Sequence, residues 1–184
     1  SEKNESFGIL QIDAHADLRD AYEGFEFSHA SIMFNALKQK QVSKLVQVGI
    51  RDYCEDELNL IQNSQGRIQT FFDRDLQYQM FRGDSWERIC NRIVSALPQN
   101  LYLSFDIDGL DPKLCPNTGT PVAGGLNTEQ VLFLLEKIVR SGRRFLAFDL
   151  NEVAPGAEGD EWDVNVAARL LYRIANLVAY SQKK

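Results

Sequence analysis

Five short apolar runs, spread over 184 residues, are the feature that most limits the folds open to this chain. The runs cover residues 7–12, 44–50, 67–72, 101–107 and 144–150. Each is almost continuously apolar, which is typical of strands buried on both faces of a parallel sheet. The intervals between the runs are long enough for helices. The sequence therefore predicts an α/β fold, a three-layer αβα arrangement with a mostly parallel sheet, in a single domain of residues 1–184.

Polar residues mark the expected starts of three helices. Asp84 and Glu87 have the spacing of a capping pair at the start of one helix. Asn127 is predicted to open a second helix, which stops at Gly142. Asp163 is predicted to cap the last helix of the chain. The apolar residues after each start recur at helical spacing, so we expect these faces to pack in the core.

Two acidic clusters stand at the ends of the first and fourth apolar runs. The first comprises Asp13, His15 and Asp17, and the second comprises Asp106 and Asp108. Alternate residues of an extended chain point to the same side, so each cluster can converge on one point. Ionised carboxylates packed this closely repel one another. They would therefore stay protonated unless cations were bound beside them. The first cluster alone is also compatible with solvated polar residues, but the two together indicate a metal site.

Four carboxylates and one imidazole suit a pair of divalent cations. Hard oxygen ligands with a single His favour manganese, although zinc, iron or cobalt can occupy the same geometry. Two such ions about 3.5–4 Å apart lower the pKa of a bridging water and generate hydroxide near neutral pH. The chemistry that these residues indicate is metal-dependent hydrolysis.

The combined motifs resemble the ureohydrolase family, which includes arginase, agmatinase and formiminoglutamase. The matching segments are residues 13–17, 104–112, 119–126 and 148–153. The resemblance implies an arginase-like fold, two Mn²⁺ ions and hydrolysis of a guanidino or formimino carbon, with urea released from a guanidino substrate. By position, Asp13 and Asp106 would bridge the two metals. Asp17 would bind one ion, and His15 with Asp108 would bind the other.

The resemblance also implies catalytic and substrate-binding residues. His29 matches a His that donates or shuttles a proton to the leaving amine, a duty that suits imidazole near neutral pH. A His satisfied by the backbone at a helix start is the alternative. Glu152 matches a Glu that binds a guanidinium through a charge-assisted pair, with a solvated carboxylate as the alternative. Asp17 completes the implied catalytic set, and Asp149 is expected behind the ligands, where an acid orients them.

One ligand of the family has no counterpart in this sequence. That ligand is a His in a Gly-Gly-Asp-His segment well upstream of the Asp-Ala-His motif, whereas His15 and His29 are the only histidines here. One of the two Mn²⁺ sites is therefore incomplete in this chain. We expect the chain to lack the N-terminal third of the family fold and to form its C-terminal two-thirds. A non-catalytic relative that acts in binding or regulation is the alternative.

Loop residues favour an agmatinase-like member. Arginases carry an acid two positions after an Arg-Asp pair to bind the substrate ammonium, and Cys54 stands at that position here. The segments 17–20 and 28–31 look more like those of agmatinases. Formiminoglutamase and arginase remain alternatives. A phosphoesterase is disfavoured because only Arg19 lies beside the clusters and Glu152 would repel a phosphate.

Composition limits the partners and the compartment. With 20 basic and 26 acidic side chains the net charge is −6, which disfavours a nucleic-acid partner. The apolar runs are too short for a membrane span and residues 1–6 are no signal peptide, so we expect a cytoplasmic enzyme with a small-molecule guanidino or formimino substrate. The three widely spaced cysteines are expected to be free thiols. The resemblance implies a homo-oligomer, either a trimer or a hexamer.

Overall fold

The computed structural model describes residues 6–183, which are organised around one five-stranded sheet. The strands are β1 (Phe7–Ile12), β2 (Val42–Ile50), β3 (Ile68–Phe72), β4 (Asn100–Asp106) and β5 (Arg144–Asn151). They lie in the order β3-β2-β1-β4-β5, and every pair of neighbours is parallel. All five predicted runs are confirmed as strands, and their ends differ from the prediction by two residues or fewer.

The strand order reverses direction at β1. From β1 the chain adds β2 and β3 on one side, and it then crosses over to place β4 and β5 on the other side. The chain leaves the carboxyl ends of the neighbours β1 and β4 in opposite directions, which opens a crevice between them. Such a switch point is the usual ligand position in a parallel α/β sheet. Both predicted acidic clusters lie at the carboxyl ends of these two strands.

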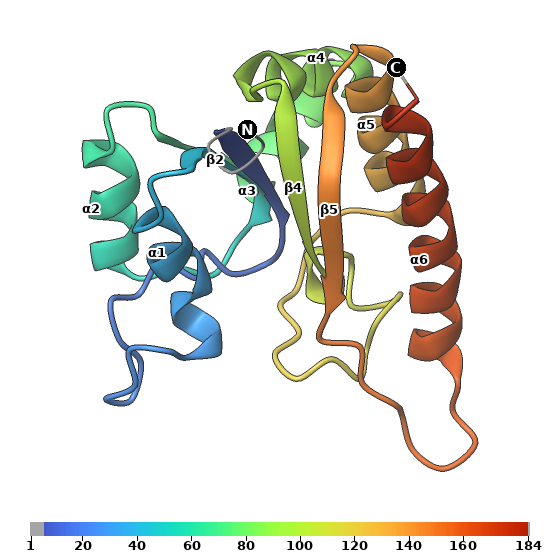
Figure 1. The fold of residues 1–184 in the computed structure, drawn as a ribbon. Helices are drawn as coiled ribbons and strands as arrows, with labels where there is room; N and C mark the ends of the chain where they lie inside the picture. Colours follow the sequence, from blue (N-terminus) through green and yellow to red (C-terminus); the bar gives the residue numbers. More distant parts are fainter. Residues whose placement is uncertain (1–5, 184) are drawn as a thin grey trace.

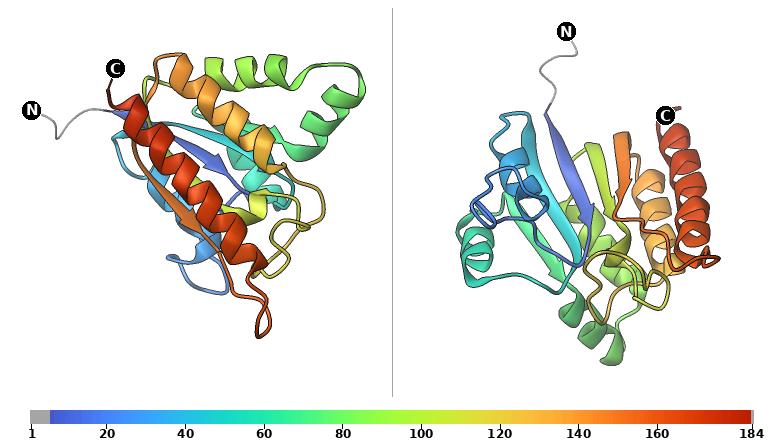
Figure 2. Two further views of the ribbon diagram at one scale, coloured as in Figure 1. Left: turned by 90° about the vertical axis from the view of Figure 1, so that its right-hand side faces the viewer. Right: turned by 90° about the horizontal axis from the view of Figure 1, so that it is seen from below.

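Helices cover both faces of the sheet (Figure 1, Figure 2). The helices α1 (Ile32–Leu37) and α2 (Glu55–Asn63) lie on one face. The other face carries α3 (Asp73–Phe81), α4 (Trp86–Ala96), α5 (Thr128–Arg140) and α6 (Trp162–Ser181). This is the predicted three-layer αβα arrangement. None of the helices within residues 6–183 combines the length and the apolar character that a membrane crossing needs.

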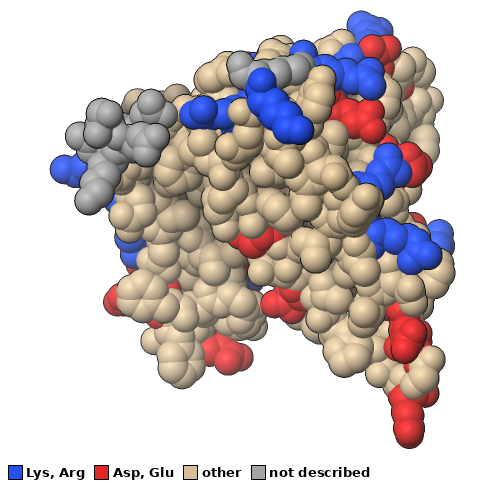
Figure 3. All heavy atoms as spheres, turned by 45° about the vertical axis from the view of Figure 1, so that its right-hand side comes forward, with Lys and Arg blue, Asp and Glu red and all other residues tan. Residues whose placement is uncertain are grey.

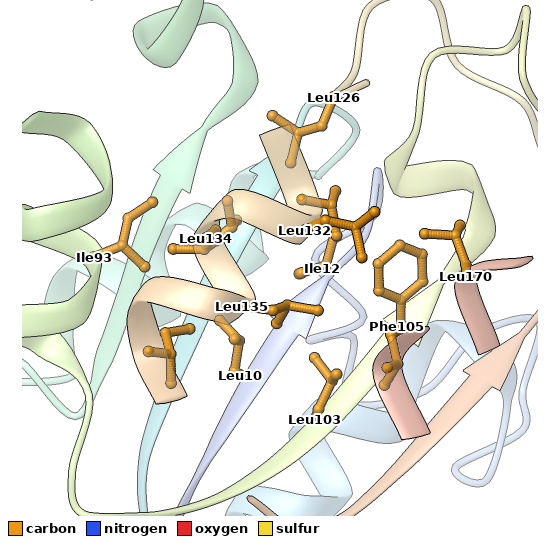
Figure 4. Close-up of a cluster of buried hydrophobic side chains, with 14 of the residues drawn as sticks. Leu10, Ile12, Ile93, Leu103, Phe105, Leu126, Leu132, Leu134, Leu135 and Leu170 are labelled. Atoms are coloured by element: carbon orange, nitrogen blue, oxygen red, sulfur yellow. The ribbon is translucent and has the colours of Figure 1, made fainter. Parts of the chain in front are cut away.

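The larger core lies between the sheet and α4, α5 and α6. Figure 4 shows Leu10 of β1 and Phe105 of β4 among the side chains that meet Leu135 of α5, and all three are almost fully buried. Burial of one such side chain contributes about 1.5–3 kcal/mol. A smaller cluster on the opposite face includes Ile9 and Met33. Both faces of β1 are therefore packed, which fixes the strand that carries the first acidic cluster.

The predicted cap of α4 is wrong by one residue. Ser85 caps the helix instead of Asp84, because Ser85 has the extended backbone next to the first helical residue and its Oγ accepts the Arg88 N–H at 3.2 Å. Asp84 forms an ion pair with Arg88 at 3.0 Å. Glu87 does not complete a capping box, since its carboxylate accepts the Lys137 ammonium at 2.6 Å.

The other two predicted caps differ in outcome. Asn127 caps α5 as predicted, and Gly142 lies just beyond that helix with a left-handed φ of 89°. Asp163 does not cap α6, which begins at Trp162. Its carboxylate is 1% exposed and accepts the backbone N–H of Asn117 at 2.9 Å. The Asp163 side chain therefore makes a tertiary contact with Asn117 instead of the local cap that the sequence predicted.

Gly109 allows the chain after β4 to approach the end of β1. It ends the short 3-10 helix η3 (Ile107–Gly109), which directly follows β4. A Cβ atom at this position would lie 2.8 Å from the backbone N and 3.1 Å from the Cα of Asp13. Backbone atoms at such distances must shift, because no flexible side chain can move aside. The approach lets the Ala14 N–H reach the Asp108 carboxylate at 3.1 Å.

We expect Gly109→Ala to lower the free energy of unfolding by about 1–3 kcal/mol, the usual range for overpacking a close contact. The measurement is urea unfolding followed by circular dichroism. Gly119→Ala is the matched control, because a Cβ there would meet only the flexible end of Glu152 at 3.3 Å. We expect that control to change stability by less than about 0.5 kcal/mol. Equal losses in the two variants would show that the approach at Gly109 is not tight.

The three cysteines are free thiols, as predicted, and they differ in accessibility. Cys90 and Cys115 are fully buried, and burial raises the pKa of each thiol to about 12. Almost no thiolate therefore exists on either residue at pH 8. We expect a thiol reagent to modify only the half-buried Cys54 in the native protein, and all three cysteines in denaturant. Mass spectrometry of the labelled chain checks this, and native labelling of Cys90 at the rate of Cys54 would contradict it.

Candidate active site

A cleft of about 870 Å³ opens at the carboxyl ends of the strands. The seven residues predicted to bind metal or substrate all line it, namely Asp13, His15, Asp17, His29, Asp106, Asp108 and Glu152. Figure 3 shows acidic side chains in and beside the hollow at the lower edge of the molecule. The fold therefore brings together side chains from four separate segments of the sequence.

Asp13, His15 and Asp108 form the tightest group in the cleft. The His15 Nδ1 atom lies 3.1 Å from the Asp108 carboxylate and 3.5 Å from the Asp13 carboxylate. One possible donor atom from each of the three lies within 4.8 Å of the others, a spacing that fits a single cation. Both carboxylates are buried, whereas the His15 side chain is 24% exposed. The group therefore opens to the cleft through the imidazole side.

Asp17 and Asp106 face the same cleft beside this group. Burial, with the nearby Asp13 carboxylate, raises the pKa of Asp17 to about 10 and that of Asp106 to about 9. Burial also raises the pKa of Asp13. The acids therefore cannot all be ionised at neutral pH unless positive charge is added. A donor set of carboxylates and one imidazole fits hard divalent cations, which would add that charge.

The hydrogen bonds of His15 also indicate a site suited to a cation. Contacts with the Asp108 and Asp13 carboxylates raise the pKa of His15 to about 10. Burial alone would raise the pKa of Asp108, but the hydrogen bonds from His15 and the Ala14 N–H outweigh it and lower that pKa. The proton on His15 thus occupies the place between carboxylates where a cation would bind. Cation binding at this site must displace that proton.

Asp17 and Glu152 share an unusual backbone conformation. Their φ angles are 55° and 59°, in the left-handed region. Within residues 6–183 the only other non-glycine residues with positive φ are Glu23 and Gln65. Such conformations cost on the order of 1–3 kcal/mol and gather at functional sites. Asp17 is held in place because its carbonyl oxygen accepts the Met33 N–H at 3.1 Å.

The remaining predicted residues lie around the rim of the cleft. His29 begins the 3-10 helix η2 (His29–Ser31), and its exposed ring meets Tyr22 edge-on at 5.5 Å. Glu152 directly follows β5 and is exposed. Asp149 was expected to orient the ligands, but its carboxylate accepts the hydroxyls of Tyr102 at 2.6 Å and Ser104 at 3.1 Å. In the described part of the chain Asp149 has no hydrogen bond to any of the five predicted ligands. Its oxygens accept hydrogen bonds from residues of β4 instead.

Sequence reasoning missed three residues that contact the site. Arg51 follows β2 and donates to the carbonyl oxygens of Asp108 at 2.7 Å and Val122 at 2.8 Å, so it joins η3 to a loop that lines the cleft. Gln11 and Gln47 are fully buried in the carboxyl-terminal halves of β1 and β2. The sequence did offer a clue, since each Gln is a polar residue inside an apolar run and Arg51 stands at the end of one. The contacts of these residues can be identified only once the strand register is known.

Comparison with known proteins identifies the family of the chain. Residues 1–176 match the profile of the arginase family. The sequence is 31% identical to the N(1)-aminopropylagmatine ureohydrolase of Synechocystis sp. over 98% of this chain and 55% of that protein. It is 33% identical to the agmatinase of Pyrococcus horikoshii over 89% of this chain and 53% of that protein. The chain thus spans about half the length of the curated relatives that it matches.

Solved structures show the same fold. A hypothetical agmatinase from Burkholderia thailandensis matches with a TM-score of 0.77 and 28% identity, covering 99% of this chain and 53% of that chain. Arginase from Bacillus caldovelox matches with a TM-score of 0.78 and 22% identity over 92% and 60% of the two chains, a likeness of fold alone. The predicted arginase-like fold and the predicted family are both confirmed. The chain belongs to the arginase family.

Proposed function

We propose that this protein is a metal-dependent hydrolase of a guanidino C–N bond, agmatinase-like, and that it releases urea. The observation that carries the proposal is the convergence of four Asp carboxylates and one His on the crevice between β1 and β4. Membership of the arginase family supports the reaction class. Similarity to an agmatinase and to an aminopropylagmatine ureohydrolase supports a small guanidino substrate.

The five predicted ligands would hold two divalent cations, with Mn²⁺ as the preferred ion, and one of the two sites would lack the upstream His of the family. His15 and Asp108 would bind one ion and Asp17 the other, while Asp13 and Asp106 would be shared. When bound, such a pair of cations lowers the pKa of a coordinated water enough to supply hydroxide near neutral pH. The raised pKa values of Asp17 and Asp106 support this assignment, because their protons would be replaced by metal.

The charges that line the cleft favour a cationic substrate without a carboxylate. Arg19 is the only Lys or Arg among the described lining residues. Its guanidinium lies 3.9 Å from the buried Glu57 carboxylate and 5.0 Å from the centre of the Tyr22 ring, so it is already engaged. Agmatine and other guanidino amines suit this lining. Arginine, guanidinobutyrate and formiminoglutamate carry carboxylates that the acidic lining would repel.

Two rim residues would act on the substrate itself. The Glu152 carboxylate would bind the guanidinium through paired, charge-assisted hydrogen bonds. The His29 imidazole would transfer a proton to the leaving amine. Both line the cleft that holds the five predicted ligands, which supports their roles. Asp17, the third predicted catalytic residue, would act by holding one of the two cations.

Three wider expectations stay predictions. Residues 1–184 are proposed to form a single domain equivalent to the C-terminal two-thirds of the family fold. The protein is proposed to assemble as a trimer or a hexamer and to work in the cytoplasm.

We expect the Mn²⁺-loaded protein to release urea from agmatine or a related guanidino amine, and to act at least tenfold less efficiently on arginine and guanidinobutyrate. A colorimetric urea assay over this panel makes the measurement, with formamide assayed from formiminoglutamate as a further reaction. Efficient hydrolysis of formiminoglutamate would overturn the proposed substrate class. No product with two bound metals would point to a different guanidino compound, and neither product nor bound metal would favour the non-catalytic relative.

We expect Asp106→Asn and Glu152→Gln to separate metal binding from substrate binding. Asp106→Asn removes a shared metal ligand, so bound Mn²⁺ should fall and turnover should drop about a hundredfold or more. Glu152→Gln removes a charged partner of the guanidinium, so kcat/KM should fall by about tenfold to a hundredfold with metal content unchanged. Metal analysis beside steady-state kinetics tests both. Equal loss of Mn²⁺ in Glu152→Gln would show that Glu152 is misassigned.

A further inference from the structure

A chain of side-chain hydrogen bonds crosses three strands and ends on two candidate metal ligands. Thr70 on β3, Gln47 on β2 and Gln11 on β1 are direct neighbours in the strand register, and we call these three residues the amide relay. The Thr70 hydroxyl donates to Gln47 Oε1 at 2.7 Å, and Gln47 Nε2 donates to Gln11 Oε1 at 2.7 Å. Gln11 Nε2 then donates to Asp13 Oδ2 at 2.9 Å and lies 3.5 Å from Asp17 Oδ2.

Both glutamines are fully buried in strands whose other residues are mostly apolar. A buried amide destabilises a protein relative to an apolar side chain unless its donors and acceptor are satisfied. In Gln11 and Gln47 the oxygen and the nitrogen of each amide have partners. These partners are not limited to the other amide and the backbone. The hydrogen bonds continue from Gln11 to the carboxylates of Asp13 and Asp17.

The relay can run in only one direction. Gln47 Nε2 also donates to the Ala16 carbonyl at 2.8 Å, and Gln11 Nε2 also donates to the His15 carbonyl at 3.2 Å. A carbonyl oxygen only accepts hydrogen bonds, so each amide must turn its NH2 group toward the first acidic cluster. If either amide turned over, two oxygen atoms would face each other in the core. Gln11 therefore turns its two N–H groups toward Asp13 and the His15 carbonyl, with Asp17 Oδ2 within reach at 3.5 Å, and the donor from Gln47 supports that orientation.

We propose that Gln11, Gln47 and Thr70 are positioning residues for the metal centre, because the amide relay fixes the orientation of the Asp13 and Asp17 carboxylates before a cation binds. This inference rests on the proposed function, since it requires the two carboxylates to be metal ligands. Hydrogen bonds to ligating groups orient them, and their loss commonly weakens metal binding by about tenfold to a hundredfold. Gln47 would act through Gln11 and through the Ala16 carbonyl, which lies between two ligands, and Thr70 would act through Gln47. Neither residue touches a ligand side chain.

Gln47→Met is the decisive variant. The substitution keeps the length of the side chain and removes both polar groups, so Gln11 Oε1 loses its donor. The Gln11 amide is then held only by its bonds to Asp13 and the His15 carbonyl, and it is less firmly oriented. We expect the Kd for Mn²⁺, measured by isothermal titration calorimetry on the purified chain, to rise about tenfold or more.

Ser181→Ala is the matched control. Its hydroxyl is also buried, but it accepts the Phe145 N–H at 3.1 Å at the amino end of β5, away from the cleft. We expect this variant to lose thermal stability and to keep the wild-type Kd. Thr70→Val provides a second variant should Gln47→Met fail to fold, because it removes one half-buried hydroxyl and preserves shape. Its Kd should rise about twofold or more, the range of coupling through an intervening residue.

Three outcomes would overturn the inference. Mn²⁺ binding that is unchanged in whichever of Gln47→Met and Thr70→Val folds would show that the relay is only structural. An equal loss of affinity in Ser181→Ala would show that any buried hydroxyl has the same effect. A wild-type chain that binds no Mn²⁺ would count against the proposed metal centre itself, and the inference would fall with it. The wild-type titration therefore distinguishes failure of the proposed function from failure of the relay.

Discussion

Repulsion among the carboxylates at the carboxyl ends of β1 and β4 is the constraint around which this cleft is built. Backbone N–H groups offset part of it, since the His15 N–H reaches Asp13 at 2.7 Å and the Ala14 N–H reaches Asp108 at 3.1 Å. Burial first, and then the Asp13 carboxylate, still raise the pKa values of Asp17 and Asp106, so the cluster remains short of positive charge. Backbone N–H groups orient these carboxylates but do not balance their charge. Such a cluster is suited to binding cations rather than to structural support alone.

The topology explains why the repulsion occurs at this place. The acidic clusters are far apart in the sequence and meet only because the chain crosses from β3 to the other side of β1 before it forms β4. Gly109 then allows η3 to approach Asp13, and Arg51 holds the Asp108 carbonyl against the loop that carries Val122. Each contact joins segments that no local sequence window contains. The sheet order, more than any single motif, creates the site.

The sequence allowed the strands, the layers and the five ligand candidates to be predicted, because each depends on short-range patterns. Apolar runs define strands locally, and an acid at the end of a parallel strand has one edge to occupy. The caps at Asp84 and Asp163 were wrong because neighbouring Ser85 and a tertiary partner, Asn117, decide how those side chains are used. The roles of Gln11 and Gln47 depend on which strands are adjacent, and adjacency was not available from the sequence.

The left-handed backbone at Asp17 links the candidate metal ligands to the predicted proton donor. Ser31, the residue before α1, makes no side-chain cap, and the Asp17 carbonyl accepts the N–H groups of Met33 at 3.1 Å and Phe34 at 3.2 Å in its place. Asp17 makes these contacts with a left-handed φ of 55°. Since η2 leads directly into α1, the same contact fixes His29 relative to the acidic cluster. The conformational cost at one residue thereby sets both the direction of a ligand and the place of the imidazole that would complete the reaction.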